Sequence, residues 1–436
     1  MEFACRFGGI LHHLIIAFRS RYMNERSRCT TAGTNRPGTT TKAVIVAVVV
    51  TAFFPVTGRA QDATVLRPVR TAPTQEFLVN AGIRDWGPAT VTAATVLAGG
   101  SGLFAIDART GKLKWGFRPA GISSSVSTPP AVSGEIAIAP FGAANPGAVV
   151  AVSMTTGKEL WRGPDPAVNA GVTVSGELAY ILSKKGEFSA LAVATGREAW
   201  KVVFSKRLAP CPTLPIVREG IVYFVAAADA TVGDAKKPAG YYLLALDALS
   251  GKELWRYRAE APYVQSGACL TQPVITATSI FATGEQRLYA VNRATGRDLW
   301  PSIEVRQPVE GRERAVEVSQ LVDAGDVLIG MTGGFLNAFE KTSGRTAWQV
   351  PGEYYMSHPS MAVAGNVLYF QGSPKSKPAA AARGTLNALD LNTRAILWSF
   401  ARPTAEPNWP FGWVTPVDGG IWVDSYSAMV KLRGGP

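Results

Sequence analysis

One pattern recurs seven times after residue 100, and it constrains the fold of this 436-residue chain more than any other feature. Each copy holds an alanine ten residues before a tryptophan, and a threonine or serine five residues after that alanine. Glycine follows the threonine or serine in six copies, and Arg394 takes its place in the seventh. The tryptophans of the seven copies are Trp115, Trp161, Trp200, Trp255, Trp300, Trp348 and Trp398. Repetition at this spacing indicates a chain built from similar structural units.

Each copy has the features of two strands joined by a tight turn. Residues alternate around the alanine, as they do in a strand with one buried face. The Thr-Gly-Lys/Arg centre is typical of a hairpin, because glycine adopts the positive φ that other residues resist. The second strand ends in the tryptophan. We expect a packing role for this indole, with its N–H in need of one partner.

A further strand pair precedes each hairpin, as in the segment PAVSGEIAIA, so each unit holds four strands. The units repeat every 39 to 55 residues from alanine to alanine. Four-stranded units at this period predict an all-β, eight-bladed β-propeller. The last unit, residues 415–436, lacks its tryptophan strand, so we expect an N-terminal strand to close the last blade. Residues 63–70 are the predicted donor, and their pairing would remove an open sheet edge.

The pattern Ala-x-Asp-x-x-Thr-Gly-x-x-x-Trp resembles the tryptophan-docking repeat of the quinoprotein alcohol dehydrogenase-like superfamily, over residues 63–436. The resemblance implies a propeller of pyrroloquinoline-quinone (PQQ) type repeats. It leaves the function open, because that superfamily holds quinone-dependent alcohol dehydrogenases, the assembly lipoprotein BamB and periplasmic repeat proteins that bind no cofactor. The aspartate of the pattern is kept at Asp107, Asp247 and Asp390, where we expect it to cap turns.

Residues 1–60 have the features of a targeting segment. Basic residues precede the apolar run 43–56, and the small residues Gly58 and Ala60 offer a cleavage site, as in a signal peptide. Met23 is a second candidate start. The apolar run is shorter than the roughly 20 residues of a membrane span. We therefore expect a periplasmic or secreted protein, and contact with a membrane only if this segment is retained uncleaved.

The rest of the chain, residues 61–436, is predicted to be a single propeller domain and a monomer. The whole chain is 47% apolar and 17% charged, a composition typical of a well-buried globular protein. Its formal charge is +12, but the basic residues are scattered and form no run longer than two. Nucleic-acid binding needs clustered cations, so no nucleic-acid partner is expected.

Few residues are suited to catalysis. Beyond the two histidines of the N-terminal segment, His358 is the one histidine of the chain, which excludes a multi-histidine metal site. No nucleophile elbow, phosphate loop or CxxC pair is present. A calcium-bound quinone would need an acidic cage, and the superfamily's alcohol dehydrogenases carry an adjacent Cys-Cys pair that this chain lacks. We expect no catalytic residue, no metal and no cofactor.

The segments that lead into the first strand of each blade are rich in aromatic residues. In a propeller these segments gather at one rim of the channel, where they form a surface for a protein or small-molecule ligand or fill the channel. The predicted rim binding surface consists of Tyr263, Tyr354, Tyr355, His358, Trp409, Phe411 and Trp413.

The leading hypothesis is an exported, non-catalytic binding or scaffolding propeller that acts through this rim. The alternative is a PQQ-dependent alcohol or sugar dehydrogenase with PQQ and calcium in the channel. A third hypothesis is a glycan- or peptide-handling enzyme whose carboxylates the sequence does not reveal.

Cys211 and Cys269 stand at the same offset in neighbouring units, within Cys-Pro-Thr-Leu-Pro and Cys-Leu-Thr-Gln-Pro. Repeat geometry therefore predicts that they lie side by side at the rim. A disulfide would form there in an oxidising compartment. The alternative is that adjacent inner strands hold the two Cα atoms beyond the ~4.4–6.8 Å that a bridge needs.

Overall fold

A computed structural model describes most of the chain after residue 65. The described residues are 66–79, 89–123, 125–142, 146–166, 171–183, 185–204, 208–211, 213–228, 240–259, 269–309, 311–332, 334–354, 361–373, 385–401, 411–425 and 428–434. They belong to one compact unit, 56–436. The predicted targeting segment 1–60 and the start at Met23 lie outside the described residues. Within those residues no helix is long and apolar enough to cross a membrane.

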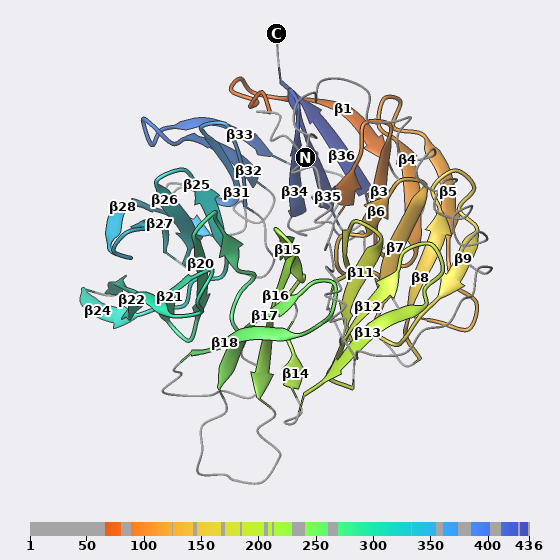
Figure 1. Cartoon of the computed structure of the whole chain (residues 1–436). Helices are drawn as coiled ribbons and strands as arrows, with labels where there is room; N and C mark the ends of the chain where they lie inside the picture. The colour runs from red at the N-terminus through yellow and green to blue at the C-terminus, as the bar shows by residue number, and fades with distance from the viewer. Residues whose placement is uncertain are drawn as a thin grey trace, which may run out of the picture. The chain divides into compact units, whose positions relative to one another are not determined.

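The chain forms an eight-bladed β-propeller, as predicted, and each blade is an antiparallel sheet (Figure 1). In blades 1 to 7 the strands follow chain order across the sheet, and in blade 8 an N-terminal strand lies beyond the last strand of the chain. Blade 1 holds β2 (Ala89–Val91), β3 (Thr95–Ala98), β4 (Leu103–Asp107) and β5 (Leu113–Phe117). Blade 2 holds β6 (Ala131–Ser133), β7 (Ile136–Phe141), β8 (Ala148–Ser153) and β9 (Glu159–Arg162). Blade 3 holds β10 (Thr173–Ser175), β11 (Leu178–Leu182), β12 (Glu187–Ala192) and β13 (Glu198–Val203). Blade 4 holds β14 (Leu208–Pro210), β15 (Ile216–Arg218), β16 (Ile221–Ala228), β17 (Tyr241–Asp247) and β18 (Glu253–Ala259).

The second half of the ring repeats this plan and adds one hairpin. Blade 5 holds β19 (Val274–Ile275), β20 (Ser279–Gly284), β21 (Arg287–Asn292) and β22 (Asp298–Glu304). The added hairpin is β23 (Arg306–Val309) with β24 (Arg312–Ala315). Blade 6 holds β25 (Leu321–Ala324), β26 (Val327–Met331), β27 (Phe335–Glu340) and β28 (Thr346–Pro351). Blade 7 holds β29 (Glu353–Tyr354), β30 (Ala362–Ala364), β31 (Val367–Ser373), β32 (Thr385–Asp390) and β33 (Ile396–Ala401). Blade 8 holds β34 (Phe411–Val417), β35 (Gly420–Ser425), β36 (Ala428–Arg433) and β1 (Thr74–Val79).

The hydrophobic cores lie between neighbouring blades. The core between blades 4 and 5 contains Tyr223 and Tyr241 from the first of them and Tyr289 from the second. Ala245, the repeat's alanine on β17, is fully buried in the same core. A small side chain is needed on the third strand because the large aromatic residues of both blades meet over it.

Most repeat tryptophans bind the turn of the next blade through the indole N–H. The N–H of Trp200 donates to the carbonyl oxygen of Ala248 at 3.1 Å. Gly251 of the same turn lies under the ring, where a Cβ would come within 2.6 Å of the indole, and its φ is +71°. Only glycine avoids both penalties. The same type of bond to a backbone carbonyl is made by Trp115, Trp161, Trp255, Trp300 and Trp398.

The repeat with arginine in place of glycine keeps the turn in another way. Arg394 adopts the left-handed conformation, with φ 62°. Its guanidinium lies 5.5 Å from the ring centre of Trp348, a cation–π contact that compensates for part of the backbone strain.

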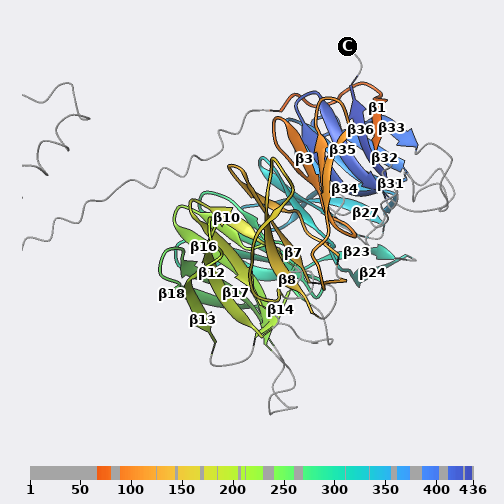
Figure 2. The ribbon, with the colours of Figure 1, turned by 90° about the vertical axis from the view of Figure 1, so that its right-hand side faces the viewer.

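The last blade is closed by an N-terminal strand, as predicted, but the predicted donor was wrong. β1, not residues 63–70, pairs with β36, from Thr74 opposite Arg433 to Val79 opposite Met429. Pro68 lacks an N–H for a sheet ladder, which disfavours the earlier segment. β1 also supplies Phe77, whose ring lies over Gly111 where other blades place the tryptophan. Figure 2 shows β1 beside β36 from a second direction.

Candidate functional site

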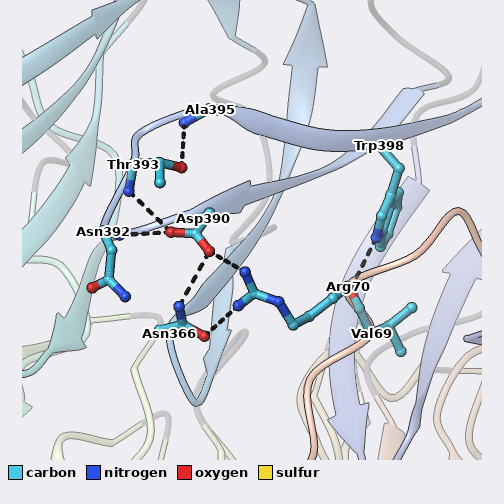
Figure 3. A network of polar contacts seen from close by, with 8 residues as sticks. All are labelled: Val69, Arg70, Asn366, Asp390, Asn392, Thr393, Ala395 and Trp398. Carbon is cyan, nitrogen blue, oxygen red and sulfur yellow. Dashed lines mark hydrogen bonds and ion pairs between the residues drawn. The ribbon is translucent and has the colours of Figure 1, made fainter.

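Residues 66–70, which precede the closing strand, fix the joint between blades 7 and 8 (Figure 3). The carbonyl oxygen of Val69 accepts a hydrogen bond from the indole N–H of Trp398 at 2.9 Å. The backbone N–H of Val69 donates to the hydroxyl of Tyr369 at 2.7 Å. Burial raises the pKa of Tyr369 to about 12, so this hydroxyl stays neutral. Both backbone polar groups of a buried residue are therefore satisfied by blade 7.

The aspartate of the seventh repeat is part of the same joint. Asp390 is buried, and its Oδ1 accepts hydrogen bonds from the backbone N–H groups of Asn392 and Thr393 at 2.9 and 3.0 Å. Its Oδ2 accepts from the guanidinium of Arg70 and from Asn366. The N–H of Thr393, and then the Arg70 guanidinium, lower the pKa of Asp390 to about 2. Both oxygens of this carboxylate are therefore used in structural contacts.

The other two repeat aspartates cap their turns, as expected. Oδ1 of Asp107 accepts from the backbone N–H and the hydroxyl of Thr110, at 2.7 and 2.8 Å. The hydroxyl bond is the main cause that lowers the pKa of Asp107. Oδ1 of Asp247 accepts the same two bonds from Ser250. These carboxylates stabilise hairpins rather than face a substrate.

Of the predicted rim residues, one is described in full. Trp413 lies on β34, and its side chain is half-buried. Tyr354 ends β29 and Phe411 begins β34, but only their backbone is described. Tyr263, Tyr355, His358 and Trp409 lie outside the described residues. The aromatic rim binding surface thus stays a prediction.

Side-chain amides connect the segments that lead into the strands β15, β19, β25 and β30 of neighbouring blades. Gln272 accepts from the N–H of Leu214 at 2.6 Å and donates to the carbonyl of the same residue at 3.1 Å, which joins blades 5 and 4. Gln320 makes the same pair of bonds with Met361, which joins blades 6 and 7. A two-point amide bond fixes both distance and orientation, so these inner segments are held in register.

Cys211 and Cys269 are joined by a disulfide at the same end of blades 4 and 5. Their Cα atoms are 5.7 Å apart, within the range that a bridge needs. Cys211 is fully buried in the core between the two blades. The bridge lies close in sequence to the Gln272–Leu214 contact, and both fasten blade 4 to blade 5.

A buried acid on β35, Asp424, was not among the residues predicted from the sequence. It is 4% exposed, and its hydrogen bonds to the backbone come from the N–H groups of Trp413 and of Asp424 itself. Oδ1 of Asp424 has no hydrogen-bond partner within the described part of the chain. Burial raises the pKa of Asp424 to about 8, so the carboxyl is largely protonated at neutral pH. The sequence signal that could have identified this residue is an aspartate that directly follows the apolar residues of a strand.

A calcium-bound quinone would need several oxygen ligands in one place. Across the described ranges, no group of three or more His, Cys, Asp or Glu side chains is close enough to hold a metal ion. The repeat aspartates use their oxygens in turns. The residues that the structure describes therefore do not fit a calcium-bound quinone.

Comparison with known proteins gives two kinds of relative. The family model described as outer membrane protein assembly factor BamB matches residues 78–164 and 145–400. BamB from Moraxella catarrhalis superposes with a TM-score of 0.60 at 14% identity, over 83% of this chain and 100% of that one. A europium-containing methanol dehydrogenase gives 0.56 at 13% identity, over 80% and 84%. At these identities the superpositions establish the fold alone.

A quinohemoprotein alcohol dehydrogenase, ADH IIB of Pseudomonas putida, is similar in sequence over a limited stretch. It is 29% identical over an alignment of 135 residues, and the match covers 27% of this chain. The match spans only 19% of the length of that enzyme.

Proposed function

Because the chain belongs to the family of PQQ-repeat propellers whose model is described as outer membrane protein assembly factor BamB, we propose that it is an exported, non-catalytic scaffold. In this proposal the loop rim of the channel binds another protein. No cofactor is needed for that role.

The observation that carries the proposal is the rigid attachment of the rim segments. The Cys211–Cys269 disulfide and the two-point amide bond of Gln272 fasten blade 4 to blade 5, and the two-point amide bond of Gln320 fastens blade 6 to blade 7. A surface that is already ordered loses less conformational entropy when a partner binds. Polar side chains near the channel are used to fasten blades, a use that suits a binding surface better than a reaction centre.

Two further features support export. Disulfides persist in oxidising compartments, and the Cys211–Cys269 bridge is of this kind. The predicted targeting segment 1–60 points the same way. Both favour a periplasmic or secreted protein that works outside the cytoplasm.

The proposal is tested by affinity capture from an envelope extract, with partners identified by cross-linking and mass spectrometry. Trp413→Ala removes a half-buried indole from the rim and should lose the captured protein. Leu249→Ala is the matched control, since Leu249 is exposed and lies in the turn at the other end of blade 4. Equal capture by both variants would place the binding surface elsewhere.

A second candidate is a PQQ-dependent alcohol or sugar dehydrogenase. The similarity to the quinohemoprotein alcohol dehydrogenase over 135 residues favours it. A similarity of this extent is what two proteins built from the same type of repeat would share for reasons of fold. A measurement of PQQ binding distinguishes the scaffold from the dehydrogenase.

A further inference from the structure

The outer strand of a propeller blade presents an open edge, and most blades of this protein carry charges there. Blades 2, 3 and 4 each place a glutamate two residues before the tryptophan and an arginine or lysine one residue after it. The pairs are Glu159–Arg162 at 2.9 Å, Glu198–Lys201 at 3.6 Å and Glu253–Arg256 at 2.6 Å. Charged side chains on an edge strand oppose pairing with another chain.

The outer strands of the other blades differ in how they are protected. β5 carries Lys114, β22 carries Asp298 and Pro301, β1 carries Glu76, and β28 ends in Pro351. A proline on an edge removes a donor and also opposes pairing. Among the eight outer strands, all of which the structure describes, β33 (ILWSFA) is the one with neither a charged residue nor a proline.

In blade 7 a polar contact takes the place of the charged pair. At the position of Lys201 in blade 3, β33 has Ser399, whose hydroxyl donates to Oδ1 of Asn387 at 2.7 Å. Asn387 is fully buried, so its oxygen needs this partner. Ile396 takes the position of the glutamate. The position that carries a cation in blades 2 to 4 thus holds a neutral side chain in blade 7, bonded to the neighbouring strand, and the edge is left uncharged.

β33 ends its sheet and pairs with β32 alone among the described strands. Figures 1 and 2 both place it on the outside of the ring. Ser399 and Ala401 are exposed, and Leu397 and Phe400 are partly buried. The six residues of β33 carry no charge. They can provide backbone hydrogen bonds and apolar contacts to an extended segment of another chain.

We propose that the outer edge of β33 receives an uncharged, extended segment of a partner protein by strand addition. A charged segment would lose hydration there without gaining a counter-ion. β-branched and aromatic residues would gain cross-strand contacts. The proposal rests on the proposed function, since it adds a second surface to a protein that binds another protein.

The probe is a fluorescein-labelled peptide whose six-residue core, matched to the length of β33, alternates threonine and valine. Binding to the full-length protein is followed by fluorescence polarisation, and its place by hydrogen exchange. We expect saturable binding with one peptide per chain and added protection of the β33 amides. Ile396→Glu/Ser399→Lys, which rebuilds the blade 3 ion pair in blade 7, should weaken binding by about tenfold or more.

The reciprocal variant keeps the test decisive if that double variant is poorly folded. Glu198→Ile/Lys201→Ser removes the ion pair of blade 3 and should add a second binding site. No peptide binding, protection away from β33, or binding that neither variant changes would each overturn the proposal. If the wild type forms a dimer and the blade 7 variant is a monomer, the edge binds a second copy of this chain, and the proposal is also overturned.

Failure at the edge is distinguishable from failure at the rim. Trp413→Ala leaves β33 untouched and should bind the peptide as the wild type does. If peptide binding fails while rim-dependent capture succeeds, strand addition alone is rejected. If capture fails as well, the proposed function is rejected with it.

Discussion

The indole N–H of Trp398 donates to the carbonyl oxygen of Val69, a residue 329 positions earlier in the chain. The same bond in blade 1, from Trp115 to Met154, spans 39 positions. The joint between the two chain ends therefore reuses the contact that joins neighbouring blades elsewhere. Closure of the ring depends on residues 66–79, which supply this acceptor, the Arg70 ion pair and the strand β1.

Trp398→Phe should loosen the closing segment. Phenylalanine keeps most of the packing but loses the buried hydrogen bond, at a cost of about 1 kcal/mol. Hydrogen exchange should increase in residues 66–79, because their acceptor is left without the donor. Trp115→Phe is the control, with a similar loss of stability in urea unfolding but unchanged exchange in residues 66–79. Equal exchange in both variants would contradict the role of Val69.

The disulfide should contribute measurably to stability. Reduction, or Cys211→Ser/Cys269→Ser, should lower the free energy of unfolding by about 2–4 kcal/mol, because the bridge restricts the unfolded chain. Alkylation with mass spectrometry before and after reduction checks that these two thiols are paired. Modification of both without reduction would show that the bridge does not form.

Asp424 should make the protein less stable as the pH rises. Its folded pKa of about 8 is above the ordinary value of 3.8, so its contribution is complete below pH 4 and is lost between about pH 4 and 8. The slope is at most about 1.4 kcal/mol per pH unit. Asp424→Asn should remove this dependence in urea unfolding measured across that range.

Asp418 is the matched control, because its shift has the opposite sign. Its hydrogen bond with Arg67 lowers the pKa of this exposed carboxyl to about 2. Its contribution is present above pH 4 and is lost as the pH falls from about 4 to 2. Asp418→Asn should thus leave the dependence between pH 4 and 8 intact. A flat profile in the wild type would contradict the burial of Asp424.

Two substitutions in hairpin turns should differ in their effect on the free energy of unfolding. Arg394→Gly relieves a left-handed arginine but gives up its contact with Trp348, so the free energy of unfolding should change by under about 1 kcal/mol. Gly251→Ala adds a Cβ at 2.6 Å from the ring of Trp200, and should destabilise by more than about 1 kcal/mol. Thermal unfolding measures both, and equal losses would contradict the packing described here.

The repeats made most of the fold predictable. Their period predicted four-stranded blades, seven complete copies and one incomplete unit predicted eight of them, and the missing final tryptophan strand required an N-terminal donor. The donor itself was misplaced, because Phe77 substitutes for tryptophan and so breaks the pattern that identifies such strands. The shared offset of Cys211 and Cys269 predicted their adjacency, since equal offsets in neighbouring blades meet in space.

The contacts that escaped prediction depend on residues far apart in the chain. Arg70 and Asp390 are 320 positions apart, and nothing in either local sequence indicates the other. The pairing of β34 with β35 is irregular between Phe411 and Val414, and the N–H of Trp413 in this stretch donates to Asp424. Sequence patterns indicate the periodicity of strands, but they do not indicate contacts between residues that are far apart in the chain.

The most direct test of the central claim is a calorimetric titration of the purified protein with PQQ in the presence of calcium. The account of a non-catalytic scaffold predicts no heat of binding at cofactor concentrations up to about 100 μM, which would detect a micromolar Kd. Tight binding that is lost on removal of calcium would contradict the account, and would make the dehydrogenase candidate the correct one.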